Sequence, residues 1–322
     1  MRLSVAMCTY FGKDYIRDQL LSIHRQTVPV DEIVICDDCS EDDTVEIIRK
    51  LTKQYDLPVR LFINEWNYGY KKNFEQAICR CTGDIIFLSD QDDTWIPTKV
   101  ETIVNYFDRN PDKNFVFTNA TLINFSGAEC YSQTLFDALG MDKKTLHRFD
   151  QGYVLETLGI NCRVTGATAA FRASLIPYCI PLPMSIVHDE AIALSSAFQG
   201  KIGYISQCLI KYRQHSDQTL GIAQALKRRK MHWDNTTNIM MWHRNLAEPY
   251  DLRTKNKLDF MYRRYWAIRS SWAIFRLSHL YFLGLYRKYE TYPQRTFWWD
   301  IKSRFVYLFD RLKVSLGLIT NY

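Results

Sequence analysis

Three carboxylates lie within four residues, directly after a short apolar segment: Asp90, Asp92 and Asp93 follow Ile85–Ser89. Like charges this close repel one another, and a bound cation would remove the repulsion. Hard divalent ions such as Mg²⁺ and Mn²⁺ take oxygen ligands, and Mg²⁺ held by one or two carboxylates completes its coordination with substrate phosphates. The cluster therefore indicates a divalent-metal site for a phosphate-bearing substrate. The alternative is a solvated acidic loop.

Strand and helix patterns alternate along the first part of the chain. Apolar runs predict strands at residues 3–7, 32–36, 59–63, 84–88 and 115–118. Apolar residues at helical spacing predict helices at residues 14–26, 45–51, 71–81 and 97–107. Ser40, three residues before Asp43, is predicted to cap the second helix. This alternation favours a parallel sheet flanked by helices.

Polar clusters follow three of the predicted strands. They are Cys8-Thr9-Tyr10, Asp37-Asp38 and Asp90-Gln91-Asp92-Asp93. Open α/β sheets bind ligands beyond the carboxyl ends of their strands, so we expect the three clusters to share one crevice. The glycine pattern of dinucleotide-binding folds and the phosphate loop ending in Gly-Lys-Ser/Thr are both absent, which argues against a dehydrogenase and a P-loop enzyme.

The charge of the chain is divided unevenly. The protein has 322 residues, 47% of them hydrophobic, and a net charge of +6. Residues 221–322 contain 19 Lys and Arg against 7 Asp and Glu, a balance of +12 that leaves −6 for residues 1–220. No run of about 18 uncharged apolar residues occurs, so no transmembrane helix is expected. The two parts are therefore predicted to meet different partners.

Basic and aromatic residues alternate in the C-terminal part, at 226–233, 262–266, 281–289 and 297–305. This composition predicts a helical appendage over 221–322 that lies on an anionic membrane surface. The alternatives are a packing appendage and a homo-oligomer interface. No nucleic-acid-binding module is recognisable, so no nucleic acid is expected as a partner.

The nine cysteines are an odd number and no signal peptide precedes them, which predicts reduced thiols in a cytoplasmic protein. Cys36-x-x-Cys39 and Cys79-x-Cys81 have no matching second pair at the spacing of a zinc site. We therefore expect no zinc there.

The chain resembles the inverting family 2 glycosyltransferases with a GT-A fold, and its acidic motif is most similar to that of bacterial rhamnosyltransferases of surface-polysaccharide synthesis. The resemblance runs over about residues 3–221. The motifs that carry it are 5–10, 35–40, 67–74, 89–97, 165–168, 188–190 and 212–215. It implies an α/β GT-A domain over 1–220, Rossmann-like, with a mostly parallel central sheet flanked by helices.

The resemblance also implies the metal site. Asp92 is the leading ligand for Mg²⁺ or Mn²⁺, with Asp90 on the metal or the donor ribose, and His215 approaching the metal. Gln91 stands in the donor site where many relatives have a carboxylate. Arg213 is expected near the donor phosphates, or else in an outward ion pair.

Asp189 is the catalytic base by this resemblance, although it could merely cap a helix that begins at 188. His188 and Glu190 would orient Asp189 or touch the acceptor, and Gly166 would allow a close backbone approach to donor or acceptor. The remaining expected residues are Thr9 and Tyr10 beside the nucleobase, Asp38 on the base or ribose, Lys72 near the phosphates or base, and Asp93 and Trp95 behind the metal ligands or at the acceptor.

The function expected from the sequence is metal-dependent, inverting transfer of a sugar from a dTDP- or UDP-sugar, with rhamnose favoured. The acceptor would be a saccharide linked to a polyprenyl diphosphate lipid, at the inner face of the cell membrane. The alternatives are hexosyl or N-acetylhexosaminyl transfer and, from another class, a non-catalytic scaffold subunit bound to membranes.

Overall fold

The computed structural model describes residues 1–129, 132–158, 163–183 and 186–215, together with Asn256, Arg263, Leu277 and Ile301. The chain divides into two compact units, Met1–Thr236 and Thr237–Tyr322. Apart from those four positions, the described residues lie in the first unit. The predicted domain boundary at 220 and the predicted appendage over 221–322 lie outside the described residues, apart from those four positions.

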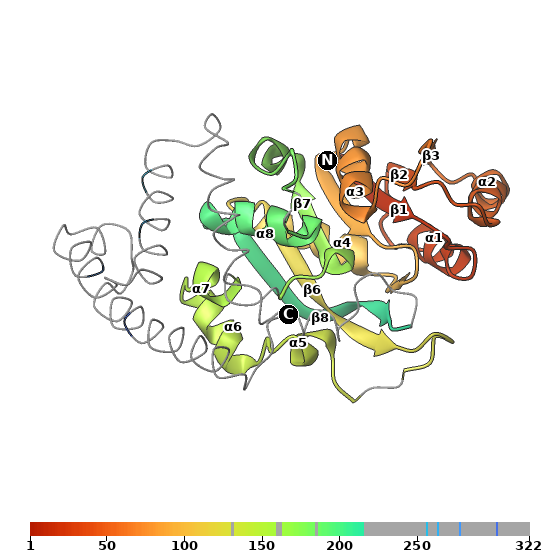
Figure 1. Ribbon diagram of the computed structural model, residues 1–322. Coiled ribbons are helices and arrows are strands. Elements are labelled where there is room, and N and C mark those ends of the chain that lie inside the picture. The colour runs from red at the N-terminus through yellow and green to blue at the C-terminus, as the bar shows by residue number, and fades with distance from the viewer. Residues whose placement is uncertain are drawn as a thin grey trace, which may run out of the picture. The chain divides into compact units, whose positions relative to one another are not determined.

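One sheet of eight strands forms the centre of the first unit, in the order β3-β2-β1-β4-β7-β6-β8-β5 (Figure 1). The strands are β1 Leu3–Thr9, β2 Glu32–Asp37, β3 Val59–Ile63, β4 Ile85–Ser89, β5 Thr94–Trp95, β6 Phe115–Ile123, β7 Ala169–Arg172 and β8 Ile202–Arg213. β3, β2, β1 and β4 are parallel, as are β6 and β8, whereas β7 is antiparallel to both its neighbours and β5 to β8. The expected α/β fold is confirmed. β5, β7 and β8 had not been predicted.

Helices flank this sheet on both sides (Figure 1). They are α1 Ile16–His24, α2 Thr44–Tyr55, α3 Tyr70–Arg80, α4 Lys99–Arg109, α5 Leu135–Ala138, α6 Lys143–Asp150, α7 Val154–Leu158 and α8 His188–Phe198. Two 3₁₀ turns, η1 Gly166–Thr168 and η2 Ala173–Tyr178, bracket β7. Helix α3 packs on β1, β2 and α8, while α1 packs on α2 and β5.

The central strands are buried on both faces, which is why they appear in the sequence as continuous apolar runs. Every residue of β2 and β4 is buried. Helices contribute apolar stripes at helical spacing, such as Val100, Ile103 and Phe107 of α4. Helix α8 is buried on all sides, so its first turn is held rigidly within the domain.

Glu32 joins the amino-terminal ends of the central strands. Its Oε1 accepts hydrogen bonds from Ser4 Oγ at 2.6 Å and from the Thr82 main chain and hydroxyl, and its Oε2 accepts from Arg60 Nη1 at 2.8 Å. Burial alone would raise the pKa of Glu32, but these hydrogen bonds lower it to about 2. The carboxylate form of Glu32 therefore stabilises the fold.

Glu32→Gln should remove this pH-dependent stabilisation. A carboxyl whose pKa falls from 4.5 unfolded to about 2 folded stabilises the protein fully above the unfolded value, and that stabilisation is lost as pH falls through the folded value. Urea unfolding should show the stability difference between wild type and variant shrinking by about 3 kcal/mol between pH 5 and pH 2. Glu41→Gln, at an exposed position, serves as the control. If the free energy of unfolding changed with pH in the same way for wild type and Glu32→Gln, the expectation would be contradicted.

Ser40 does not cap the second helix, so that prediction is wrong. Its hydroxyl donates to Asp37 Oδ2 at 2.7 Å and accepts from the Phe11 main chain at 3.0 Å. Helix α2 begins later, at Thr44. Ser40 instead ties the end of β2 to the segment that follows β1.

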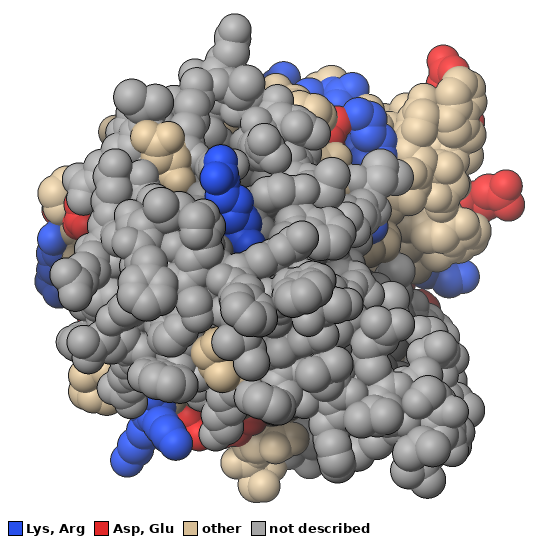
Figure 2. Space-filling view, turned by 60° about the vertical axis from the view of Figure 1, so that its left-hand side comes forward, with Lys and Arg blue, Asp and Glu red and all other residues tan. Residues whose placement is uncertain are grey.

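On the face shown in Figure 2, the charged side chains of the described residues are dispersed. On the face in Figure 2 the described Lys and Arg side chains lie in several separate places, so the described part of that face has no continuous basic patch. Within the described ranges, no helix is long and apolar enough to span a membrane. The seven cysteines found in those ranges are free thiols.

Candidate active site

The carboxyl ends of β1, β2 and β4 meet at one edge of the sheet. Thr9 lies opposite Asp37 in the register of β1 with β2, and Met7 lies opposite Ser89 in the register of β1 with β4. The three polar clusters that follow these strands are therefore neighbours, as the sequence predicted. Gln19 of α1 adds a support, because its amide donates to Ser89 Oγ at 2.7 Å and to the Asp90 carbonyl at 3.1 Å.

The acidic motif is electrostatically crowded. Burial, together with the carboxylates of Asp92 and Asp189, raises the pKa of Asp90 to about 8, and Lys99 opposes the shift. Burial, with Asp92 and Asp90, raises the pKa of Asp93 well above its usual value. Carboxyl groups that ionise this reluctantly mark a place where a positive charge would be strongly stabilising.

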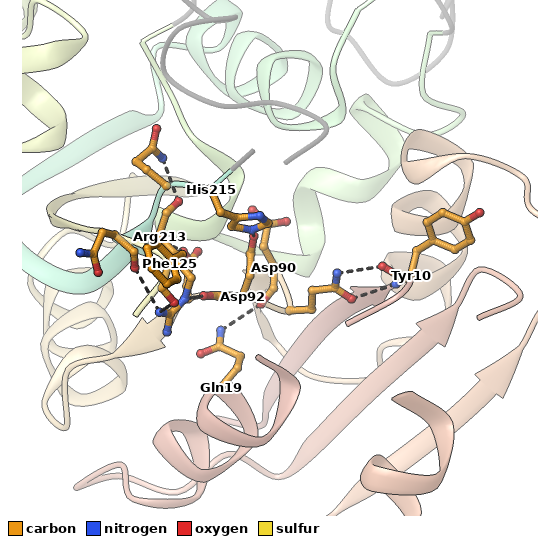
Figure 3. A network of polar contacts seen from close by, with 11 residues as sticks. Tyr10, Gln19, Asp90, Asp92, Phe125, Arg213 and His215 are labelled. Carbon is orange, nitrogen blue, oxygen red and sulfur yellow. Dashed lines mark hydrogen bonds and ion pairs between the residues drawn. The ribbon is translucent and has the colours of Figure 1, made fainter. Parts of the chain in front are cut away.

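Asp92 contacts His215 directly. Asp92 Oδ2 and His215 Nε2 lie 2.9 Å apart, and the Tyr15 ring packs on the imidazole with centroids 4.8 Å apart. Figure 3 shows Asp90, Asp92 and His215 gathered in one place. A residue that follows β8 and a residue of the loop after β4 are thus brought together, although 123 positions separate them in the chain.

The donor set of Asp90, Asp92 and His215 suits a divalent cation, since carboxylate and imidazole ligands bind Mn²⁺ and carboxylates bind Mg²⁺. Within the described ranges, no three His, Cys, Asp or Glu side chains already surround a metal position. Asp92 and His215 are bonded to each other and would have to separate to share a cation. The raised pKa of Asp90 supports the fit, because a cation would relieve that crowding.

Arg213 has a different environment from the one expected. Its Nε donates to the Asp92 carbonyl at 2.7 Å, and its Nη1 donates to the carbonyls of Asn124 and Phe125 at 3.2 and 2.9 Å (Figure 3). The residue is 3% exposed, and its guanidinium lies 5.0 Å from the centroid of the Tyr15 ring. Arg213 therefore holds main-chain segments around the acidic motif, and its burial is incompatible with an outward ion pair.

Two residues of the acidic motif have buried side chains. Asp93 is fully buried, and its Oδ1 accepts a hydrogen bond from the Arg213 main chain at 2.9 Å. Trp95 is 2% exposed, and its ring lies 5.8 Å from that of Phe87. Both side chains therefore lie beneath the site, where Trp95 cannot reach an acceptor.

Asp189 lies in the first turn of α8 and is 8% exposed. Its Oδ2 accepts from the Gly166 main chain at 2.8 Å, and its Oδ1 accepts from the Glu190 main chain at 2.8 Å. The first of these bonds ties α8 to η1, so Asp189 does more than cap its own helix. The carboxylate is held in one orientation, with lone pairs left for a further donor.

His188 is 5% exposed and stacks on Phe74 with ring centroids 3.9 Å apart. Burial lowers the pKa of His188; Asp189 opposes the shift and Lys71 adds to it, so the ring is neutral near pH 7. Neither ring nitrogen has a hydrogen-bond partner among the described residues. A Cβ on Gly166 would lie 2.9 Å from His188 Nε2, so the absence of a side chain at Gly166 permits a close approach to this histidine.

Gln91 clamps the end of β1. Its Oε1 accepts from the Tyr10 main chain at 2.8 Å, and its Nε2 donates to the Tyr10 carbonyl at 2.9 Å (Figure 3). A carboxylate could accept the first bond but could not donate the second. Gly12 leaves room for this amide, because a Cβ there would lie 2.2 Å from Gln91 Oε1. The amide at this position therefore has a structural reason of its own.

Gln91→Glu should destabilise the domain by about 1–2 kcal/mol, because one hydrogen bond is lost and a carboxylate oxygen faces the Tyr10 carbonyl. Urea unfolding without added metal measures the change. Gln54→Glu, an exposed position on α2, introduces the same charge elsewhere and should alter stability by less than about 0.5 kcal/mol. Equal stability of wild type and Gln91→Glu would show that the clamp contributes nothing.

The side chains expected to bind the nucleotide differ in how far they are buried and bonded within the protein. The Thr9 hydroxyl is buried and donates to Asp37 Oδ2 at 2.6 Å, so it faces the protein. Asp38 accepts from the Asn64 amide and from the main chain of Tyr68 and Gly69, which shapes the loop before α3.

Tyr10 and Lys72 keep more contact with solvent. Tyr10 is 46% exposed, so its ring is accessible for stacking. The Lys72 ammonium pairs with Glu75, one turn along α3, although half of its side chain is exposed. Tyr10 and Lys72 are therefore the two members of this group most available to a ligand.

Four supporting residues had not been predicted from the sequence: Gly12, Tyr15, Gln19 and Lys99. Each acts on a segment distant in the chain, and none belongs to a motif. Lys99 resembled an ordinary surface lysine at the start of a helix, yet it is fully buried.

The family of the chain follows from comparison with known proteins. The pattern of the family described as Glycosyl transferase family 2 matches residues 4–176, more than half of the chain. The chain therefore belongs to family 2 of the glycosyltransferases.

Related sequences agree. An uncharacterized glycosyltransferase of Nostoc sp. is 26% identical over 293 residues, which cover 86% of this chain and 88% of that protein. A glycosyltransferase of Bacillus subtilis, provisionally named for teichuronic acid biosynthesis, is 29% identical over 44% of this chain and 51% of its own. Proteins of unassigned function from Mycobacterium bovis and Mycobacterium tuberculosis are 31% identical over 130 residues, and the match spans only 37% of their length.

Solved structures share the fold. TarS of S. aureus in complex with UDP-GlcNAc has a TM-score of 0.56 at 16% identity, covering 82% of this chain and 72% of that one. A mannosyltransferase from Pyrobaculum calidifontis, in complex with GDP-Man and Mn²⁺, has a TM-score of 0.52 at 20% identity, covering 95% and 86%. At these identities the likeness establishes the fold.

Proposed function

We propose that this glycosyltransferase is metal-dependent and inverting, that it uses a dTDP- or UDP-sugar, and that rhamnose is the sugar transferred to a lipid-linked saccharide of bacterial cell-surface polysaccharide. One observation carries the mechanism. The Asp189 carboxylate, from α8, lies near enough to Asp90 of the acidic motif to raise its pKa. A candidate base and a candidate metal ligand are therefore close enough to interact electrostatically.

Inversion needs a base on the face of the sugar opposite the leaving group. Asp189 takes the proton of the acceptor hydroxyl as that oxygen attacks the anomeric carbon, and the bond to the nucleoside diphosphate breaks. The bonds from Gly166 and Glu190 fix the carboxylate for this step. His188, neutral and next to Asp189 in the chain, stacks on Phe74 and would help to hold the start of α8 in place.

Asp90, Asp92 and His215 would hold Mg²⁺ or Mn²⁺. A divalent cation bound there supplies neutralisation of the negative charge that builds on the departing diphosphate. The donor lies along the ends of β1 and β2, where Tyr10 offers an aromatic face to the nucleobase. Asp38 holds the loop before α3 in the same region, and Lys72 adds a positive charge there. Support for the metal comes from the electrostatic crowding of the acidic motif and from the Mn²⁺ bound by the Pyrobaculum enzyme.

The choice of rhamnose rests on the acidic motif from Ser89 to Pro97. Hexosyl and N-acetylhexosaminyl transfer are the alternatives, and the two solved structures bind UDP-GlcNAc and GDP-Man. A screen of dTDP-rhamnose, UDP-glucose, UDP-galactose and UDP-GlcNAc, with Mn²⁺, Mg²⁺ or EDTA, separates these readings. We expect the fastest metal-dependent turnover with dTDP-rhamnose and an inverted anomer by NMR. Faster reaction with another donor would select the alternative, and metal-independent turnover would refute the metal site.

Residues 221–322 are proposed to bring the enzyme to the inner face of the membrane, where a polyprenyl-linked acceptor lies. Each cation near an anionic surface contributes about 1 kcal/mol and is screened by salt, whereas buried aromatic faces are not. The full-length protein should therefore sediment with phosphatidylglycerol vesicles, less strongly at high salt, and not with phosphatidylcholine vesicles. Protein that stays in the supernatant with anionic vesicles at low salt would favour a packing or homo-oligomer role.

A further inference from the structure

Lys99 occupies an unfavourable position for a cation. It is fully buried, and it is the first residue of α4, where the helix dipole disfavours positive charge. Burial lowers the pKa of Lys99 to about 7, although the nearby carboxylates of Asp93 and Asp90 oppose the shift. Nothing in the catalytic roles proposed above uses this side chain.

Two contacts define where the ammonium lies. Lys99 Nζ donates a hydrogen bond to the Ala167 carbonyl at 2.8 Å, and it lies 3.9 Å from the centroid of the Trp95 ring. Ala167 is the middle residue of η1, a single 3₁₀ turn that is itself buried. The side chain of Lys99 therefore reaches from the helix behind the acidic motif to a turn 68 residues further along the chain.

That turn also holds Asp189. The main-chain N–H of Gly166, the residue before Ala167, donates to Asp189 Oδ2 at 2.8 Å. The Gly166 Cα is wedged against His188, since a Cβ there would lie 2.9 Å from Nε2. Two hydrogen bonds thus fix the orientation of η1. One runs from Lys99 Nζ to the Ala167 carbonyl, and the other runs from the Gly166 N–H to Asp189 Oδ2.

We propose that Lys99 is a positioning residue, which aligns the base Asp189 with the acidic motif by anchoring η1 through the Ala167 carbonyl. The inference rests on the proposed role of Asp189. The competing account is that Lys99 only neutralises Asp90 and Asp93. The two accounts make different predictions for η1. If Lys99 anchors the turn, removal of its ammonium group should loosen η1. If Lys99 only neutralises the carboxylates, η1 should stay as ordered as in the wild type.

Lys99→Met separates these accounts, because it keeps much of the side-chain volume but removes charge and donor. Hydrogen–deuterium exchange of a peptide covering residues 164–169 should be slow in the wild type and at least 10-fold faster in the variant. Turnover should fall by about 10- to 100-fold with little change in donor KM, the effect of a displaced base. Mn²⁺ should bind as tightly or more tightly, since a cation near Asp90 and Asp93 has been removed.

Two further variants complete the test. Ile103→Ala, at another buried position of α4, controls for general destabilisation and should leave exchange at 164–169 slow. Lys99→Arg keeps charge and donor and should restore protection and most of the turnover. Unchanged exchange and turnover in Lys99→Met, or fast exchange in the wild type itself, would overturn the inference. If no nucleotide sugar is turned over by the wild type, the proposed function fails instead, and exchange still decides whether Lys99 anchors η1.

Discussion

Asp189→Asn should lower the turnover number by about 10²- to 10⁴-fold, the usual contribution of a positioned base, while the affinity for the nucleotide-sugar donor stays within about threefold of wild type. The amide has the size of the carboxylate but cannot take a proton from the acceptor hydroxyl. Turnover is measured by product formation with the donor identified in the screen, and donor affinity by calorimetry.

Asp18→Asn provides the matched control. Asp18 lies in the first turn of α1, as Asp189 does in α8, but it is exposed. If Asp189 served only to complement a helix terminus, both variants would show small stability changes and normal turnover. Near-normal turnover by a folded Asp189→Asn protein would exclude Asp189 as the base.

Asp92→Ala should abolish the stimulation of nucleotide binding by Mn²⁺, weakening UDP or dTDP binding in the presence of the metal by on the order of 100-fold, or about 3 kcal/mol. The reason is that Asp92 supplies a carboxylate to the expected metal site and also orients His215, at 2.9 Å. Calorimetric titration of the nucleotide, with Mn²⁺ and with EDTA, measures both the affinity and its dependence on the metal.

Asp108→Ala removes an exposed carboxylate from α4 and should bind the nucleotide like the wild type. Comparison with it shows whether the effect of Asp92→Ala comes from the site or from a general change in charge. Metal-stimulated binding of wild-type strength by the Asp92→Ala protein would remove Asp92 from the metal site.

The sequence by itself determined the class of fold and the edge of the sheet where the site lies. The apolar runs of β1, β2 and β4 mark strands buried on both faces, and polar residues follow each of them. Because parallel neighbours end at the same edge, the motifs around Thr9, Asp37 and Asp90 had to meet there. The order of the motifs was enough to indicate a family 2 glycosyltransferase.

Only the tertiary structure decided which side chains are exposed at this edge of the sheet and which are bonded within the protein. Arg213 and Lys99 look in the sequence like ordinary cations, yet each donates to carbonyls of distant segments, at Asn124 and Phe125 in one case and Ala167 in the other. In the sequence, Gln91 only replaces a carboxylate that many relatives have at this position. The structure gives the amide its own role, because it makes two hydrogen bonds to the Tyr10 main chain. A residue type specifies what a side chain can donate or accept. Which partner it meets depends on strand register and on the packing of segments far apart in the chain, and local sequence patterns do not carry that information.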